Sequence, residues 1–378
     1  MPVETTLNLA WTLLLALLGL ALPVGVGLLA AGPAKRGAGT AGRLLLAGAV
    51  AVLVSLACGF SLQYGALHAP QLGESPQRSW QWTPLGEGSG LLAWAGPLVA
   101  AEPGRLVLAL LQAVGAAAVV VLALGPTSQR LPGPGLVAVA LFAGGLLYPL
   151  LGHWTWGGGW LASTGRTAYL GHGYVDWSGA GPIYALGGMM ALAGLLVSGA
   201  GREAAGDDES LPPGAAVVAL LGIVALNLAG AWSWVPRLPL VAVNTLVSAA
   251  AAGAVATVYM AFATGRFRPA MLIRGLLAGA VASAGIAPFA PPLTLALVGA
   301  VAGLLTPLGS YLVQRVWRLD DPAGLVPAFG CAGLWGILAV GLLADGTFGQ
   351  GLNGVGQGLY LGVAGQGDVG RRPLHRRD

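Results

Sequence analysis

Ten apolar stretches, each long enough to cross a lipid bilayer, dominate this chain of 378 residues. The hydrocarbon core of a bilayer is about 30 Å thick, and a helix needs about 20 mostly apolar residues to span it. Because the stretches are apolar on every side rather than along one face, they indicate helices surrounded by lipid or by one another. They lie near residues 7–31, 44–65, 105–125, 133–152, 178–200, 214–235, 237–262, 268–288, 291–314 and 322–344.

Charge is scarce along the whole chain. Charged residues make up 8% of it, whereas a soluble domain carries about 25%. This composition excludes a soluble globule, a disordered chain and a nucleic-acid binder. Cys58 and Cys331 both lie in apolar stretches and are not spaced as metal ligands, so we expect no metal and no cofactor. We predict an all-α integral membrane protein with ten or eleven transmembrane helices, in a single domain over residues 1–367.

The number of spans depends on a weak eleventh stretch near 350–366, which Gly, Asn and Gln dilute. Hydropathy alone supports ten spans. The basic residues support eleven, because fourteen of the eighteen Lys and Arg residues then lie on one side, and such residues collect on the cytoplasmic side. Eleven spans place the N-terminus outside and the short basic tail, residues 368–378, in the cytoplasm, with the protein in the inner or plasma membrane. Both counts remain open at this point.

Two segments of the chain resemble each other at an offset of 145 residues. Each opens a span with an aspartate and continues with a glycine, an aromatic residue and a second glycine at the same spacing. Because five spans separate the copies, the second copy crosses the membrane in the opposite direction. We therefore predict two inverted halves, about 7–200 and 214–344, a common architecture of transporters with the substrate path near the midplane. The matched pairs are Asp176 and Asp321, Gly179 and Gly324, Tyr184 and Phe329, and Gly188 and Gly333.

Tyr184 and Phe329 are the aromatic residues of this repeat. Each follows its aspartate by eight residues, which is about 12 Å at the helical rise of 1.5 Å per residue. Since the two segments enter a core about 30 Å thick from opposite faces, we expect the two side chains to approach each other near the middle of the membrane.

The same segments resemble a known family. The loop HWTWGGGW (153–160) and the segments VDWSGAGPIYALGG (175–188) and DDPAGLVPAFGCAGLWGILAVGLLADG (320–346) are similar to motifs of the ammonium transporter and Rhesus family. Segments 243–257 and 272–285 resemble its seventh and eighth helices. The resemblance implies eleven transmembrane helices in two inverted five-helix halves, a homotrimer with one pore in each subunit, and movement of ammonium or ammonia.

Several positions depart from the family's pattern. The family's pore holds two hydrogen-bonded histidines, and the corresponding positions here are Tyr184 and Phe329. Gly115 and Ser233 align best with the family's outer pair of phenylalanines, and Arg274 stands where the eighth helix usually carries asparagine. The four histidines of the chain lie away from the middle of any span: His68, His153, His172 and His375.

Trp156 and Asp176 match the tryptophan and the aspartate of the family's outer vestibule. An indole face attracts a cation by about 0.5–2 kcal/mol, and tryptophan is also common at the membrane interface; the resemblance favours the pore mouth. We expect Asp176 and Asp321 to cap free N–H groups at the starts of their helices, with Asp176 also attracting a cation. For Arg274, near the inner end of its span, we expect snorkelling to the interface.

The aromatic pair decides the functional prediction. Tyrosine has a reference pKa of about 10, too high for a proton relay at neutral pH, and phenylalanine has neither donor nor acceptor. We predict a membrane transporter of ammonium, ammonia or a similar small neutral solute with an impaired proton relay, whose path includes Trp156, Asp176, Tyr184 and Phe329. The alternative is a relative that does not conduct, with the two rings plugging its core, acting as a sensor, a partner subunit or a degenerate protein. Because the spans hold almost no titratable groups, we do not expect an enzyme.

Overall fold

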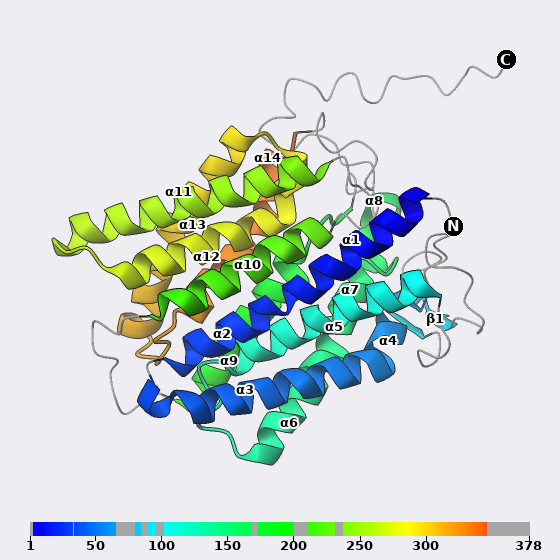
Figure 1. The fold of residues 1–378 in the computed structure, drawn as a ribbon, viewed down its shortest axis with the longest axis horizontal. Helices are drawn as coiled ribbons and strands as arrows, with labels where there is room; N and C mark the ends of the chain where they lie inside the picture. Colours follow the sequence, from blue (N-terminus) through cyan, green and yellow to red (C-terminus); the bar gives the residue numbers. More distant parts are fainter. Residues whose placement is uncertain are drawn as a thin grey trace.

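The computed structural model describes residues 3–32, 34–65, 80–84, 90–94, 102–167, 173–199, 211–230 and 237–345. Within these ranges, nine apolar helical segments have the length needed to cross a membrane, and a tenth, α10 (Pro213–Ala229), is apolar but shorter. They coincide with the ten stretches predicted from the sequence, and the predicted all-α membrane protein is confirmed (Figure 1). The weak stretch at 350–366 and the basic tail at 368–378 lie outside the described residues.

The first half of the chain supplies five of these spans. The first span bends between two helices, and the second, fourth and fifth each contain a π-helical turn, a feature that is frequent at functional sites. The elements are α1 (Val3–Gly19), α2 (Ala21–Ala31), α3 (Ala34–Val54), η1 (Ser55–Gly59), α4 (Phe60–Tyr64), α5 (Pro103–Leu124), α6 (Gly133–Phe142), η3 (Ala143–Leu147), α7 (Tyr148–Thr155), α8 (Trp160–Thr167), η4 (Ala180–Ala185) and α9 (Leu186–Ser198).

The second half begins with α10. Its first four helices each carry a proline in the first turn, where the missing N–H group costs no intrahelical hydrogen bond. A π-helical turn again opens its last span. The remaining elements are α11 (Leu238–Thr264), α12 (Pro269–Ile286), η6 (Ala287–Phe289), α13 (Pro292–Tyr311), η7 (Leu312–Val316), η8 (Val326–Cys331) and α14 (Ala332–Leu343).

The third span of each half lies at the centre of the bundle. In both α5 and the α12 span, 83% of the most apolar stretch is buried, against 28% in α11. Small residues allow such close packing: a Cβ atom added at Gly279 of α12 would lie 2.2 Å from the carbonyl oxygen of Ser248 in α11. The equivalent placement of α5 and α12 agrees with two related halves.

The two halves meet where η4 and α9 cross η8 and α14. Because α9 packs on η8 and α14 packs on η4, the two broken helices run in opposite directions, as the inverted repeat predicts. Their backbones touch. A Cβ atom at Gly188 would lie 2.2 Å from the backbone nitrogen of Gly330, and a Cβ atom at Gly333 would lie 2.6 Å from that of Ala185.

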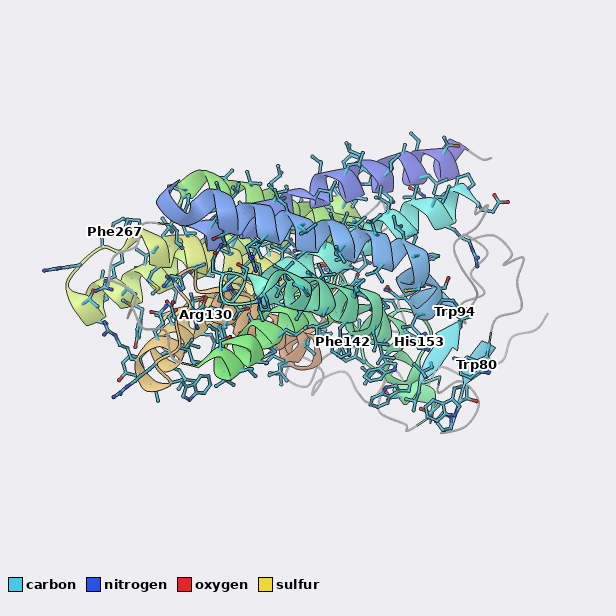
Figure 2. The ribbon with its side chains drawn as sticks, turned by 90° about the horizontal axis from the view of Figure 1, so that it is seen from below. Trp80, Trp94, Arg130, Phe142, His153 and Phe267 are labelled. Atoms are coloured by element: carbon cyan, nitrogen blue, oxygen red, sulfur yellow. The ribbon has the colours of Figure 1, made fainter. Side chains whose placement is uncertain are left out.

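A small β-hairpin interrupts the helical architecture. It consists of β1 (Trp80–Trp82) and β2 (Leu92–Trp94), which pair antiparallel within the connection between α4 and α5. Figure 2 shows the hairpin at one end of the bundle, and Arg130 and Phe267 toward the other end. Exposed tryptophans therefore lie in the hairpin at one end, and Arg130 lies toward the other end.

The crossing generates a prediction about stability. Gly188→Ala places a methyl group against the backbone of Gly330 and should lower the free energy of unfolding by about 1–3 kcal/mol, the usual cost of overpacking. Gly341→Ala is the matched control, because Gly341 lies in α14 with no atom within 4 Å of its would-be Cβ. That change should stabilise the helix by about 0.5–1 kcal/mol. Thermal unfolding of both variants in detergent tests this, and equal melting temperatures would contradict the close crossing.

Candidate functional site

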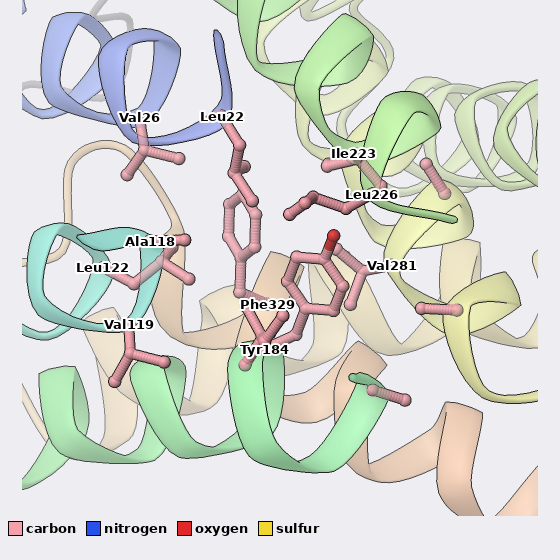
Figure 3. Close-up of a cluster of buried hydrophobic side chains, with 14 of the residues drawn as sticks. Leu22, Val26, Ala118, Val119, Leu122, Tyr184, Ile223, Leu226, Val281 and Phe329 are labelled. Carbon is pink, nitrogen blue, oxygen red and sulfur yellow. The ribbon is translucent and has the colours of Figure 1, made fainter. Parts of the chain in front are cut away.

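The rings of Tyr184 and Phe329 meet at the crossing of the two broken helices. Their centroids lie 6.1 Å apart, with an angle of 35° between the ring planes. Both side chains are fully buried. The approach of the two rings that the repeat predicted is therefore present. Apolar side chains from both halves surround the pair in Figure 3: Leu22, Val26, Ala118, Val119, Leu122, Ile223, Leu226 and Val281.

The Tyr184 hydroxyl group brings a polar atom into this apolar contact. It is buried, and no hydrogen-bond partner lies near it in the part of the chain that the structure describes. A buried hydroxyl group without a partner costs about 1–3 kcal/mol. Phe329 offers neither a donor nor an acceptor. The pair can therefore hydrogen-bond one small solute through Tyr184, but it holds no group that exchanges a proton near neutral pH.

Asp176 caps the start of the first broken helix. Its Oδ1 atom accepts hydrogen bonds from the N–H groups of Gly179 at 2.8 Å and Ala180 at 3.0 Å. Its Oδ2 atom accepts one from Gly181 at 2.7 Å. Gly179 has a φ angle of 103°, a left-handed conformation that favours glycine. The turn thus directs three backbone N–H groups at one carboxylate, and the capping role expected for Asp176 is present.

Asp321 repeats this arrangement at the second broken helix. Its two carboxylate oxygens accept hydrogen bonds from the N–H groups of Leu325 and Val326, both at 2.9 Å. Gly324, like its partner in the repeat, is left-handed, with a φ angle of 69°. Burial raises the pKa of both the Asp176 and the Asp321 carboxyl groups, and the backbone N–H donors act in the opposite direction.

Trp156 and Asp176 lie together at the start of the first broken helix. The indole Nε1 of Trp156 donates a hydrogen bond of 2.8 Å to the backbone carbonyl oxygen of Asp176. The Tyr174 hydroxyl group lies 3.4 Å from the Asp176 Oδ2 atom. We call Trp156, Tyr174 and Asp176 the rim. The rim therefore brings together two residues that the sequence analysis placed on the solute path.

Arg274 does not behave as predicted. Its side chain is 6% exposed, and its guanidinium group donates hydrogen bonds to the backbone carbonyl oxygens of Pro322 and Ala323. The prediction of snorkelling is wrong because the loop after α13 covers the side chain and supplies acceptors. Arg274 instead holds the loop that carries Asp321, and its positive charge counteracts the effect of burial on the pKa of that carboxyl group.

Sequence reasoning missed a buried polar network beside the crossing, on the side of the first half. The Gln112 Oε1 atom accepts hydrogen bonds from the Tyr148 hydroxyl group at 2.5 Å and from Gln63 Nε2 at 2.8 Å. The Gln112 Nε2 atom donates to the Tyr64 hydroxyl oxygen at 3.0 Å. All four side chains are buried. The available signal was the two glutamines inside otherwise apolar stretches, because such groups need partners once they are buried.

Gly115 has no side chain because Tyr148 occupies the space. A Cβ atom at Gly115 would lie 2.2 Å from the Tyr148 hydroxyl oxygen and 3.4 Å from Ile183 Cδ1. This glycine aligns with one of the family's outer phenylalanines. The other aligned position, Ser233, lies outside the described residues.

A second network, also missed from the sequence, holds the start of the fifth span. Asn227 Oδ1 accepts a hydrogen bond from the Ser178 hydroxyl group at 2.8 Å, and the Asn227 carbonyl oxygen accepts one from the Trp177 indole at 2.8 Å. Asn227 Nδ2 lies 3.2 Å from Thr245 Oγ1 and 3.1 Å from Ser283 Oγ. These contacts tie the loop before η4 to α10, α11 and α12.

His153 lies away from the crossing, at the end of α7. It is fully buried, with its Nδ1 atom 3.1 Å from the backbone carbonyl oxygen of Gln63. His68, His172 and His375 lie outside the described residues. Among the residues with described positions, no three His, Cys, Asp or Glu side chains gather as a metal site requires.

Comparison with known proteins identifies relatives over nearly the whole chain. The Ammonium Transporter Family is matched over residues 10–367. The ammonium transporter Amt2 of Archaeoglobus fulgidus is 28% identical over 364 residues, which cover 92% of this chain and 73% of that protein. A putative ammonium transporter of Synechocystis is 33% identical over 216 residues, covering 53% of this chain and 47% of that protein.

Solved structures share the fold. A structure described as a sensor Amt protein superimposes with a TM-score of 0.77 at 20% identity, over 93% of this chain and 86% of that chain. Mep2 of Candida albicans superimposes with a TM-score of 0.74 at 22% identity, over 90% of this chain and 74% of that chain. At these identities the structural similarity establishes only the architecture. The chemistry of the site is inferred from the residues of this chain.

Two adjacent acids test the capping role of the aspartates. In Asp321→Asn an NH2 group replaces one of the oxygens that accept N–H groups of Leu325 and Val326, so the free energy of unfolding should fall by about 1–3 kcal/mol. Asp320→Asn is the control, because Asp320 forms a partly exposed ion pair with Arg130, and such pairs contribute about 0–1 kcal/mol. Thermal unfolding in detergent separates the two, and an equal loss in both variants would argue against the cap.

Proposed function

The chain belongs to the ammonium transporter family, and on that basis we propose that it moves ammonia, the neutral form of ammonium, between its two inverted halves. Ammonium gives up its proton to water at the outer side, and ammonia passes the contact of Tyr184 with Phe329. A bare ion placed in this apolar core loses its hydration without compensation, which costs far more than the transfer of a neutral molecule. The neutral solute is therefore the species that this path suits.

The aromatic pair is the observation that carries the proposal. It lies at the crossing of the halves, where family members place two histidines, and both rings are fully buried. Histidine exchanges protons near neutral pH, whereas tyrosine titrates near 10 and phenylalanine not at all. A proton therefore has no carrier at this point, and solute movement is separated from charge movement.

The geometry of the rim supports a role for Trp156 and Asp176 in receiving the solute at the outer mouth of the path. Trp156 is held by its hydrogen bond to Asp176, and its side chain is only partly buried. The Asp176 carboxylate already accepts hydrogen bonds from three backbone N–H groups and lies 3.4 Å from the Tyr174 hydroxyl group. Asp176 therefore attracts a cation through its charge at a distance and does not bind it directly. The indole face of Trp156 is the surface that receives the solute.

Orientation and assembly belong to the same proposal. The protein is a multi-pass membrane protein, and we place its N-terminus outside and its C-terminus in the cytoplasm. Arg130 and the turn around residues 265–268 lie toward the end opposite the hairpin, which agrees with a cytoplasmic face. We extend the homotrimer of the family to this chain. Mass measurement of the purified protein in detergent checks the assembly.

A second function is favoured by the burial of the pair. Both rings are fully buried, and even a small solute has to displace them to pass. On that ground the chain is a relative that does not conduct and that acts as a sensor or a partner subunit. A structure described as a sensor Amt protein shares this fold. The two functions differ in whether the purified protein accelerates solute movement.

Reconstituted vesicles distinguish these functions. With an inward ammonium gradient, we expect the lumen of protein-containing vesicles to become alkaline faster than that of protein-free vesicles, because ammonia enters and takes up a proton there. Recordings on the same vesicles should show no ammonium-evoked current, since the crossing holds no proton carrier. A current that scales with the amount of protein overturns the neutral mechanism, and rates equal to protein-free vesicles establish the non-conducting alternative.

Restoring histidines tests whether the relay is the missing part. Tyr184→His combined with Phe329→His should produce an ammonium-evoked current, because imidazoles then face each other where the rings now lie 6.1 Å apart. Phe289→His is the control, since Phe289 is equally buried but packs against Trp177 away from the pair. A current in the control, or none in the double variant, contradicts the assignment of the path to this pair.

A further inference from the structure

We propose that the hairpin of β1 and β2 positions the indole ring of Trp156 on the rim, with Trp154 as the positioning residue that ties the loop of Trp156 to the hairpin. The inference rests on the proposed function only for the use of this indole by the solute. The position of the ring is a separate claim, because it can be measured without any transport.

The loop that carries Trp156 joins α7 to α8. Trp156 directly follows α7, and α8 begins at Trp160. The Trp156 N–H group donates a hydrogen bond of 2.8 Å to the Gly152 carbonyl oxygen, and the Gly159 N–H group donates one of 3.0 Å to the His153 carbonyl oxygen. These hydrogen bonds fold the loop back on the end of α7, but they are local and join it only to that helix.

The hairpin holds this loop on both sides of Trp156. Trp154 Nε1 donates a hydrogen bond of 2.9 Å to the Leu91 carbonyl oxygen. The backbone N–H group of Trp160 donates one of 3.1 Å to the Gly90 carbonyl oxygen. The two acceptors directly precede β2. Trp156 is therefore bracketed by one anchor two residues before it and another four residues after it.

The hairpin can act as a support because the second span holds it independently of the loop. Ala93 in β2 is fully buried. A Cβ atom added at Gly65, directly after α4, would lie 2.7 Å from the Trp94 backbone nitrogen, so β2 lies against the end of α4. Figure 2 shows Trp94 and His153 at the same end of the bundle. The Leu91 carbonyl group is thus presented by a backbone that is already packed in place.

The indole ring of Trp156 has one hydrogen bond of its own. Its Nε1 atom donates to the Asp176 carbonyl oxygen at 2.8 Å. A single hydrogen bond fixes one edge of the ring, but not the direction in which its face points. A cation is attracted only when it lies over the face, within about 6 Å of the ring centroid. A shift of the loop therefore weakens the attraction of the rim for the solute.

Two tryptophans beside Trp156 provide a matched pair of variants. Trp154→Phe removes the N–H group that binds the Leu91 carbonyl oxygen and keeps an aromatic ring. Trp160→Phe is the control, because Trp160 Nε1 is buried and has no hydrogen-bond partner among the residues that the structure describes. The two rings meet edge to face, with centroids 5.8 Å apart. Both substitutions therefore alter the same aromatic contact, and only one removes a hydrogen bond.

Hydroxyl-radical footprinting measures the position of the indole directly. The full-length protein in detergent is exposed to the radicals, and oxidation of Trp156 is followed by peptide mass spectrometry. Trp154→Phe should speed this oxidation about two- to tenfold, the factor expected from loss of one ordinary hydrogen bond, and Trp160→Phe should not change it. If Trp154→Phe does not fold, Gly159→Ala replaces it, because its Cβ atom would lie 3.0 Å from the Gly90 carbonyl oxygen and press the loop off the hairpin.

The reconstituted vesicles measure the consequence for the solute. The rate at which the lumen becomes alkaline is recorded over a range of ammonium concentrations. Trp154→Phe should raise the concentration for half-maximal rate about two- to tenfold, again the factor for one hydrogen bond. The maximal rate should stay unchanged, because only reception at the rim is weakened. Trp160→Phe should change neither value.

Several outcomes overturn the inference. Unchanged oxidation of Trp156 in Trp154→Phe shows that the hairpin does not position the ring. Equal acceleration by Trp154→Phe and Trp160→Phe shows that the aromatic contact and not the hydrogen bond holds the loop. Faster oxidation without a change in the half-maximal concentration overturns the link between the ring and the solute. If the native protein moves no ammonia, the proposed function is refuted, while faster oxidation in Trp154→Phe alone keeps the positioning role.

Discussion

The structure depends on how two helices begin inside a membrane protein. Lipid offers no hydrogen-bond partner, so the free N–H groups of a helix start must be satisfied within the chain. Asp176 and Asp321 meet this requirement, each with a left-handed glycine that turns the backbone N–H groups toward the carboxylate. Because both caps are buried, the two helices can start within the bundle.

The position at which the two broken helices start decides which side chains meet at the centre of the bundle. The broken helices cross in opposite directions at Gly188 and Gly330, where backbones touch without side chains between them. This approach brings Tyr184 and Phe329 into contact, although the Tyr184 hydroxyl group remains buried without a partner in the described chain. The unfavourable free energy of that group is tolerated because polar networks and close helix packing around it hold the crossing together.

The chemistry of the centre follows from the two rings. The aromatic pair offers one hydroxyl group, and neither side chain has a reference pKa near neutral pH. Around it the first half adds features that the repeat does not copy. Trp156 is fixed at the rim by Asp176, and Tyr148 fills the space that Gly115 leaves open. The two halves therefore share an architecture, while the rim is built from residues of the first half.

The sequence by itself determined the membrane class, the ten apolar spans, the inverted repeat and the aromatic pair, because hydropathy and fixed spacing are local properties of the chain. Only the tertiary structure decided the partners of buried polar groups. Arg274 was expected at the interface, yet it binds carbonyl groups of a loop that follows the next helix of the chain. Gln112, Asn227 and Tyr148 likewise take partners from distant segments. A hydrogen bond between segments far apart in sequence depends on how the helices pack, and no local pattern encodes that distance or direction.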